Sequence, residues 1–411
     1  MNRRSFLVPL ALAMLVMSLA VACGEEEEGT RGTPTPAAPA ALQGLSPGEP
    51  FKIGVSLPLS GSLAVTGQKY LRGFELAVQE LNAASGIGGH RVELVVRDDG
   101  GDPNRAVTLV QELVDGNGVR VMLGPILSSQ VQAVAQYIGE KRIPMLSGFT
   151  ASALNDVNRY PYLFSWLYDT KDSVRARLQF ALRTFNPRRV GILAEETTAG
   201  DDFVAAARDV IREFPGVGLS VQRYPQGTAD IQPQLEALRR AGVDVIVSIA
   251  IGTDQLRTMR TLNTMGWNVR AVGGPTWGDP EITRQVGGPE ALGNFYGLLY
   301  RKFTVARGGQ PDQRVADFLA KLRNALGQSS LQTDPTPYGI AFDTIYIIKE
   351  AVERGGSARG EDIKAQLERL TYDGITAVYR FSAQSHMAQG PESWAIVSAG
   401  SFNNGVWTRA E

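Results

Sequence analysis

The chain has 411 residues, of which 43% are apolar and 20% are charged. This is an ordinary globular composition, and the length favours two lobes over one domain. A formal net charge of −1 leaves no basic excess with which to hold a phosphate backbone, so we expect no nucleic-acid partner.

The first 22 residues have the pattern of an export signal. A short basic start ends at Arg4, residues 6–22 are almost wholly apolar, and small residues precede position 23. This order is typical of a signal peptide. The apolar stretch also reaches the lower edge of membrane-spanning length, so an uncleaved membrane anchor is the alternative. We predict a signal peptide over residues 1–22.

Cys23 is the only cysteine of the chain. Preceded by the residues AVA, it resembles a bacterial lipobox, although that motif usually has leucine where Ala20 stands. The resemblance implies that Cys23 receives lipid and begins the mature protein. Residues 24–50 contain four consecutive glutamates and then many Pro, Ala, Thr and Gly, which cannot form a core. We therefore expect residues 23–50 to be a lipidated cysteine and a flexible tether.

A first series of strands and helices follows the tether. Hydrophobic patterns predict strands at 51–57, 92–97, 119–123 and 143–146, and helices at 67–84, from 103 onward and at 128–140. Asp102 and Pro103 supply an N-cap and a first helical residue. Strands that are apolar on both faces, each followed by a helix, indicate a parallel sheet covered on both sides.

A second series repeats this architecture. Strands are predicted at 190–194, 219–224, 243–250 and 269–272, and helices at 200–213, 231–241 and 253–265. Later helices at 312–326, 338–354 and 361–370 and strands at 378–381, 394–397 and 406–407 indicate that the C-terminal part completes both lobes. The predicted fold class is α/β, with two doubly wound parallel-sheet lobes.

The sequence shows no motif of a common catalytic site. No cysteine follows Cys23, and His90 and His386 are interpreted as turn residues. The acidic pairs at 98–99, 195–196 and 201–202 are interpreted as a turn, a solvated loop and a helix start. No Walker loop, GxSxG elbow or HExxH motif occurs. We expect a protein that is not an enzyme and that uses neither metal nor cofactor.

Loops that follow the predicted strands carry hydroxyl, glycine and aromatic residues. These loops lie at 58–67, 124–129, 147–152, 165–169, 195–200, 250–253 and 273–279. In open α/β sheets, ligands bind beyond the carboxyl ends of strands, where helices begin. Hydroxyl groups and helix N-termini with few charges suit a small carboxylate held by neutral dipoles.

An ordered series of segments resembles a known family. KIGVSLPLSGSLAVTGQ, GFELAVQELNAASGIGG, VELVVRDDGGDPNRAV, VMLGPILSS, IPMLSGFTASAL, VGILAEETTAGDDF, YPQGTADIQPQLEAL, FDTIYIIKEAVERGG and YDGITAVYRFS are similar to the ABC-transporter solute-binding proteins of the branched-chain amino acid (leucine/isoleucine/valine-binding) type. The series covers nearly all of residues 51–407. The resemblance implies the type I periplasmic binding protein fold, in which three crossovers join two lobes.

The family's organisation implies the lobes and partners of this chain. Residues 51–168 and 301–385 would form lobe I, and residues 169–300 and 386–411 lobe II. A cleft between them would close on the ligand, and the protein, as a monomer, would deliver it to an ABC permease. A lipid-anchored protein would lie in the periplasm or at the outer face of the cytoplasmic membrane. The same fold could instead act as a sensor for a receptor or regulator, and the third alternative is an exported enzyme.

The family's carboxylate-binding residues match Ser128, Gly148 and Thr150. The alternative for Ser128 is a simple helix N-cap. The neighbouring strand-end loops add Thr66, Ser129 and Gly252 to the residues expected to bind ligand.

The ammonium side of the family's site is not preserved. Ala199 stands where amino-acid binders have tyrosine, and Thr276 stands where they have the acid that pairs with the ligand's ammonium. Asp169 or Asp279 could supply that acid. Otherwise the ligand lacks an amino group and is a carboxylic acid or an amide, since a buried ammonium needs a carboxylate partner.

Three aromatic residues could stack on such a ligand. They are Trp166, Tyr168 and Trp277, and each could equally be hinge or core packing. The identity of the ligand stays open.

Overall fold

The computed structural model describes residues 42–410. The predicted signal peptide, Cys23 and most of the predicted tether lie outside the described residues. The last residues of that tether are packed, because Leu42 and Leu45 are buried. The Gln43 backbone N–H donates to the Gly356 carbonyl at 3.0 Å, and the Ala358 N–H donates to the Gln43 carbonyl at 2.8 Å. The packed body thus begins before residue 51, because two leucines within the polar stretch bury their side chains.

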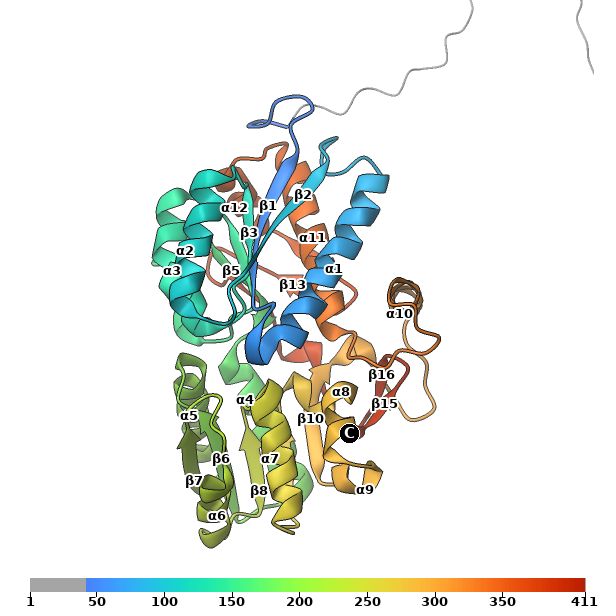
Figure 1. Cartoon of the computed structure of the whole chain (residues 1–411). Helices are drawn as coiled ribbons and strands as arrows, with labels where there is room; N and C mark the ends of the chain where they lie inside the picture. The colour runs from blue at the N-terminus through green and yellow to red at the C-terminus, as the bar shows by residue number, and fades with distance from the viewer. Residues whose placement is uncertain (1–41, 411) are drawn as a thin grey trace, which may run out of the picture. The chain divides into compact units, whose positions relative to one another are not determined.

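The first sheet has six strands in the order β14-β5-β4-β3-β1-β2, and all of its pairs are parallel. Its strands are β1 (Phe51–Leu57), β2 (Val92–Asp98), β3 (Val121–Leu123), β4 (Met145–Ser147), β5 (Leu163–Tyr168) and β14 (Met387–Gln389). Its helices are α1 (Ala64–Ala83), α2 (Pro103–Gln111), α3 (Ser128–Lys141), α11 (Thr336–Gly355) and α12 (Gly360–Leu367). Helices α1 and α11 cover one face and α2 and α3 the other (Figure 1). This is the doubly wound arrangement predicted from the sequence.

The second sheet has eight strands in the order β11-β16-β15-β10-β9-β8-β6-β7. They are β6 (Arg189–Glu195), β7 (Gly218–Tyr224), β8 (Val245–Ser248), β9 (Arg270–Gly273), β10 (Phe295–Tyr300), β11 (Thr304–Val305), β15 (Trp394–Asn403) and β16 (Val406–Arg409). The pairs from β7 to β10 are parallel, whereas β15 is antiparallel to both β10 and β16. The C-terminal end of the chain therefore adds a hairpin to a parallel sheet.

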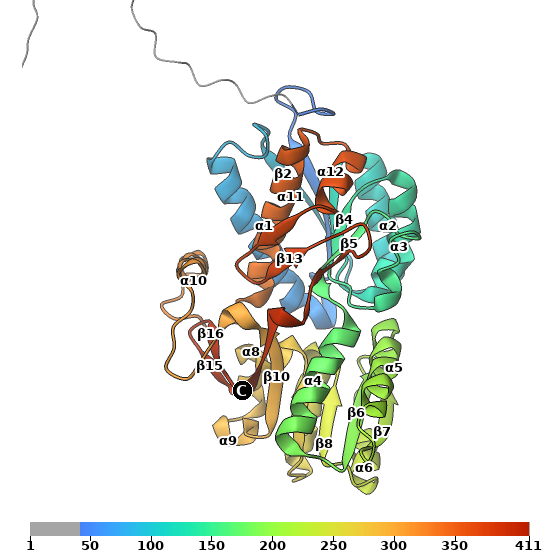
Figure 2. The same ribbon diagram turned by 180° about the vertical axis from the view of Figure 1, so that it is seen from behind.

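Helices also cover both faces of the second sheet. They are α4 (Thr170–Phe185), α5 (Thr198–Arg212), α6 (Gln232–Arg240), α7 (Gly252–Thr264), α8 (Pro280–Val286) and α9 (Pro289–Leu292). Helix α7 lies in front of this sheet in Figure 1, and α4 lies in front of it in the view from behind, so the two helices cover opposite faces (Figure 2). The sequence analysis predicted neither β5, α4 nor β10.

The chain passes between the two sheets three times. It leaves the first sheet after β5, returns to it after β11, and leaves it again between β14 and β15. Two expected boundaries differ from the strand pairing. Residues 304–305 pair in the second sheet, and β14 pairs with β5 in the first, so the last crossing follows Gln389 rather than residue 385. A strand as short as β14 has no hydrophobic period that marks it in the sequence.

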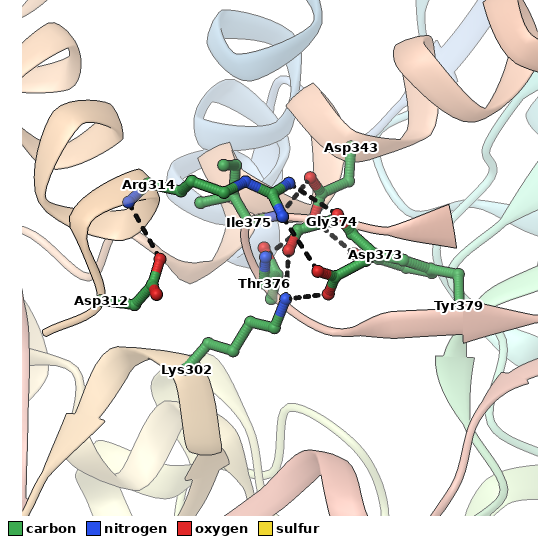
Figure 3. A network of polar contacts seen from close by, with 9 residues as sticks. All are labelled: Lys302, Asp312, Arg314, Asp343, Asp373, Gly374, Ile375, Thr376 and Tyr379. Carbon is green, nitrogen blue, oxygen red and sulfur yellow. Dashed lines mark hydrogen bonds and ion pairs between the residues drawn. The ribbon is translucent and has the colours of Figure 1, made fainter. Parts of the chain in front are cut away.

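A polar network holds the hairpin of β12 (Thr371–Asp373) and β13 (Val378–Arg380) beside the second crossing (Figure 3). Asp343, on α11, accepts hydrogen bonds from the backbone N–H groups of Ile375 at 2.6 Å and Thr376 at 2.8 Å. The hydroxyl of Tyr379 donates to it at 3.1 Å. Burial raises the pKa of Asp343 to about 6, although these hydrogen bonds act in the opposite direction.

The outer part of this network is ionic. Lys302 and Arg314, the latter on α10 (Gln313–Ala325), both pair with Asp373. Lys302 lies in the short 3-10 helix between β10 and β11, so these pairs tie the segment before the second crossing to the hairpin.

His386 departs from its interpretation as a turn residue. Its ring is 1% exposed and stacks on Phe164 with ring centroids 3.9 Å apart. Its Nδ1 lies 2.9 Å from the Leu163 carbonyl oxygen and its Nε2 lies 3.1 Å from Glu368 Oε1. The parallel pairing of β14 with β5 carries the preceding residue into the core. His90 does lie in the predicted turn over residues 85–90.

Candidate ligand-binding cavity

A cavity of about 190 Å³ lies where the carboxyl ends of strands from both sheets meet. Lobe I contributes residues that follow β1, β3, β4 and β5, and lobe II contributes residues at the ends of β6, β8, β9 and β10. This is the position at which doubly wound sheets bind ligands. Much of the wall is apolar, and its aliphatic and proline members are Leu63, Ile126, Leu127, Leu167, Ile249, Ile251, Pro275, Pro337 and Ile340.

Most of the residues predicted to bind ligand line this cavity. They are Thr66, Ser128, Ser129, Gly148, Thr150, Tyr168, Ala199, Gly252 and Thr276. Segments that are far apart in the sequence meet here because both sheets direct their strand ends toward it. Thr276 Oγ1 is buried and has no hydrogen-bond partner among the described residues. A ligand in the cavity could supply that partner.

Ser128 is positioned by a tight turn after β3. Gly124 has φ +76°, and a Cβ atom there would lie 2.0 Å from the Ser56 carbonyl oxygen, so only glycine fits. Helix α3 then begins at Ser128, with Leu127 at its N-cap and no side-chain cap bond. Ser128 Oγ instead accepts hydrogen bonds from the backbone N–H groups of Thr150 at 3.2 Å and Ala151 at 3.4 Å.

These contacts leave the Ser128 hydroxyl able to donate. Its oxygen accepts from the Gly148–Ala151 loop, so its hydrogen is free for an acceptor in the cavity. The first N–H groups of α3 have no acceptor within their own helix. The structure therefore does not place Ser128 as a simple N-cap, and it presents several donors on one side of the cavity.

The two tryptophans predicted to stack on the ligand belong to the core instead. Trp166 is fully buried, with ring centroids 5.6 Å from Tyr70 and 5.9 Å from Phe74. Trp277 is also fully buried, and its Nε1–H donates to the Ala250 carbonyl at 3.0 Å. Neither lines the cavity, so the packing alternative describes both.

The two aspartates suggested as ammonium partners are engaged elsewhere. Asp169 caps α4, accepting from the Lys171 N–H at 2.8 Å and from the Ser152 hydroxyl at 2.5 Å. Asp279 caps α8 and lies 2.9 Å from Lys69 Nζ. Each aspartate precedes a helix and caps it, so its side chain is already bonded within the fold.

Glu195 lines the cavity, and its interpretation as part of a solvated loop is wrong. It ends β6, is 4% exposed, and accepts a hydrogen bond from the Tyr224 hydroxyl at 3.4 Å. Burial, together with the nearby charge of Asp254, raises the pKa of Glu195 to about 7. The acidic pair 195–196 looks like a solvated loop in the sequence because Glu195 is buried only by segments that are distant in the chain.

Asp334 is a second buried carboxyl on the wall. It is 3% exposed and accepts from the Thr336 N–H at 2.8 Å, just before α11. Burial and the neighbouring Asp279 raise the pKa of Asp334 to about 7, although Lys69 acts in the opposite direction. No sequence pattern singled out this residue, because it stands alone in a segment without a predicted element.

Arg177 brings a buried guanidinium to the same cavity. It lies on α4, two turns into the helix, and is 2% exposed. Its Nη1 donates to the Ser248 carbonyl at 2.7 Å, and its Nη2 and Nε donate to the Ser173 hydroxyl and carbonyl at 2.8 and 3.2 Å. Burial lowers its pKa to about 10, which leaves it charged at neutral pH. The sequence analysis missed Arg177 together with its helix.

Polar contacts join the lobes around the cavity. Besides the Lys69 pair, the Ser152 N–H donates to Asp202 at 2.5 Å, and the Thr198 hydroxyl donates to Gln132 at 3.3 Å. No group of three or more His, Cys, Asp or Glu side chains in residues 42–410 is arranged to hold a metal ion. Over the same residues, no helix is long and apolar enough to cross a membrane.

Residues 50–401 match the model of a protein family described as periplasmic binding protein. The chain belongs to this family. The resemblance drawn from the sequence and the α/β fold are thereby confirmed. The family is one of binding proteins, which agrees with the expectation that the chain is not an enzyme, and it implies an extracytoplasmic location.

Individual relatives show the same organisation. The Leu/Ile/Val-binding protein homolog 8 of Brucella abortus is 27% identical over 273 residues, 63% of this chain and 66% of that protein, just under two thirds of its length. The substrate binding protein LivJ of the branched-chain amino acid transporter of Streptococcus pneumoniae, solved with isoleucine, is 22% identical with a TM-score of 0.73, covering 87% of this chain and 98% of LivJ.

A second solved structure holds a different ligand. A solute binding protein of an ABC transporter from R. palustris, in complex with 4-hydroxybenzoate, is 19% identical with a TM-score of 0.75 and covers 88% of this chain and 96% of that one. At these identities the solved structures establish the fold alone.

Proposed function

We propose that this protein is the extracytoplasmic ligand-capture subunit of an ABC importer, which binds a small carboxylate between its lobes and delivers it to a membrane permease. The observation that carries the proposal is the cavity itself. It sets the free donors of Ser128 and the α3 N-terminus against mostly apolar walls from both lobes. That combination suits an anion with an apolar body.

The solved relatives support this ligand class. LivJ holds isoleucine and the R. palustris protein holds 4-hydroxybenzoate, and both molecules join a carboxylate to an apolar body. The two differ in whether an ammonium is present. Glu195 and Asp334 are the carboxyls of this cavity that could accept an ammonium, in place of the acid that Thr276 replaces.

Capture would work through closure of the lobes. Each lobe carries part of the wall, so the ligand gains its full set of contacts only when both lobes meet. The contacts from Lys69, Ser152 and Thr198 across the cleft would stabilise the closed form that a permease recognises. Lipid at Cys23, outside the described residues, would hold the protein at a membrane surface.

A thermal-shift comparison tests the proposal. The purified protein is heated with leucine, isoleucine and valine, with their deaminated acids, and with benzoate and 4-hydroxybenzoate. A ligand at a hundred times its Kd adds about 2.7 kcal/mol of stability, which is easily measured. Stabilisation by amino acids alone would indicate an ammonium site, and stabilisation by the deaminated or aromatic acids alone would indicate a carboxylic acid importer. No shift with any of them would contradict the proposed ligand class.

A further inference from the structure

The guanidinium of Arg177 has no carboxylate partner among residues 42–410. Of the five N–H donors of an arginine, three are used, and all three bond to uncharged oxygens of Ser173 and Ser248. The ring of Phe203 lies 5.0 Å from the guanidinium carbon on one side. The cavity borders the side chain, so its remaining donors are available to a bound molecule.

A buried charge without a counter-ion is costly, and the acids of the cavity do not relieve this one. Glu195 and Asp334 line the same cavity, yet neither forms an ion pair with Arg177. Burial and a neighbouring acid raise the pKa of each, and neither has an ion pair with Arg177 to oppose that rise. The cavity thus contains a positive charge that forms no ion pair with a carboxylate of residues 42–410, and a bound anion can compensate it.

Helix α4, which carries Arg177, begins against the loop of lobe I that contains Thr150. The backbone N–H of Thr170, the first residue of α4, donates to the Thr150 carbonyl at 2.8 Å. Ser173 lies about one helical turn further, roughly 4.5 Å along the axis, and Arg177 folds back to bond it. Arg177, Ser128 and Thr150 line the same cavity, and the two oxygens of one carboxylate can accept charge-assisted hydrogen bonds of about 2.8 Å from donors on two sides.

We infer that Arg177 of lobe II and Ser128 with Thr150 of lobe I hold the same ligand carboxylate, so that the cavity selects carboxylate anions and rejects their neutral amides. The inference rests on the proposed function and narrows it, because the sequence analysis kept both a carboxylic acid and an amide as alternatives for a ligand without an amino group. It also differs from the expectation, drawn from the sequence, that neutral dipoles alone hold the carboxylate. An amide could accept through its carbonyl oxygen, but it would leave the charge of the guanidinium uncompensated and would turn its NH₂ group toward other donors.

The test compares matched acids and amides by isothermal titration calorimetry. The probes are 4-methylpentanoate against 4-methylpentanamide, benzoate against benzamide, and leucine against leucinamide. They are titrated into the wild-type protein and into Arg177→Met, Arg177→Lys and Ser128→Ala. Arg175→Met is the control, since Arg175 is an exposed residue on the same helix that pairs with Glu213.

We expect the wild-type protein to bind the acid of at least one pair at least about tenfold more tightly than its amide. Arg177→Met should lower the affinity for the acid roughly 10- to 100-fold, and Arg177→Lys should lower it less. Arg175→Met should bind the acid as tightly as the wild type does. Chemical unfolding of each variant shows whether it is folded. If Arg177→Met does not fold, the comparison of acid and amide on the wild-type protein still decides.

Two results would overturn the inference while the proposed function stands. One is a wild-type protein that binds an amide as tightly as its acid. The other is a folded Arg177→Met that binds the acid unchanged while Ser128→Ala loses it. If no acid binds the wild-type protein, the proposed function and the inference fall together.

Discussion

Lys69 Nζ of lobe I lies 2.9 Å from Asp279 Oδ2 of lobe II, and the two residues are 210 positions apart in the chain. The amine also lies 3.0 Å from Glu281 Oε2 and is 4% exposed. Burial by itself would lower the pKa of Lys69, but Asp279, Asp334 and Glu281 together raise it, so the amine stays charged. One buried cation therefore interacts electrostatically with three acids where the two lobes meet.

Lys69→Met is expected to weaken ligand binding at least about tenfold. In the variant, closure of the lobes would bury carboxyls that have lost their cation, which is strongly unfavourable. Titration with the strongest ligand of the thermal-shift panel measures the change. Arg72→Met, which removes an exposed pair with Glu75 on the same helix, should change affinity little. Equal affinity in Lys69→Met and the wild type would show that this pair does not stabilise the closed form.

Ser128→Ala removes the hydroxyl donor of lobe I. A hydrogen bond to a charged group contributes about 1.5–3 kcal/mol, so affinity for the bound acid should fall roughly 10- to 100-fold. Thr108→Ala, at an exposed position on α2, is the control. Unchanged affinity in Ser128→Ala would assign this serine to the positioning of the 148–151 loop alone.

Glu195 makes stability depend on pH. Its pKa is raised from 4.5 to about 7, so the folded protein keeps a proton that the unfolded chain releases between these values. The contribution is fully present below pH 4.5 and is lost as the pH rises to about 7, by roughly 3 kcal/mol in the unfolding free energy. Urea unfolding from pH 4.5 to 8 measures the slope.

Glu195→Gln should flatten that slope and should be more stable than the wild type at pH 8. The slope will not vanish, because Asp334 and Asp343 also have raised pKa values. Glu196→Gln changes the exposed neighbour and should keep the slope of the wild type. A Glu195→Gln profile parallel to that of the wild type would mean that Glu195 is ionised in the folded protein.

Asp343→Asn tests the network of Figure 3. Ile375 and Thr376 donate to different oxygens of Asp343, and asparagine replaces one of these oxygens with an amide NH₂, so one of the two N–H groups would face a donor. Leaving buried donors unpaired should cost about 3 kcal/mol, measured by the urea midpoint. Asp312→Asn, at the N-cap of α10, should cost less than about 0.5 kcal/mol because asparagine caps equally well. Equal midpoints for the two variants would count against the network.

Trp277→Phe separates packing from ligand contact. The smaller ring leaves a void and loses the hydrogen bond to Ala250, at a cost of about 2 kcal/mol in stability. Ligand affinity should change by less than about threefold, because Trp277 does not line the cavity. Trp267→Phe, at a half-buried position, should cost less stability. A large loss of affinity with unchanged stability would indicate that Trp277 contacts the ligand.

The parallel sheets and most of their helices follow from local patterns in the sequence. The strand at 51–57 was placed to the residue, and the helix after Asp102-Pro103 begins as predicted. The antiparallel hairpin of β15 and β16 and the short β14 were not recognised as members of particular sheets, because pairing between distant segments leaves no local period.

The family, the doubly wound class and the donor side of the cavity are predictable from the sequence, since the turn at Gly124 and the start of α3 are local features that position Ser128. The state of the charged groups depends on the tertiary structure. Whether Glu195 is solvated or buried, whether Trp277 touches ligand or core, and whether Arg177 finds a counter-ion depend on segments that meet only in the fold. Burial and pairing set the energy of a charged group, and neither is a property of its neighbours in sequence.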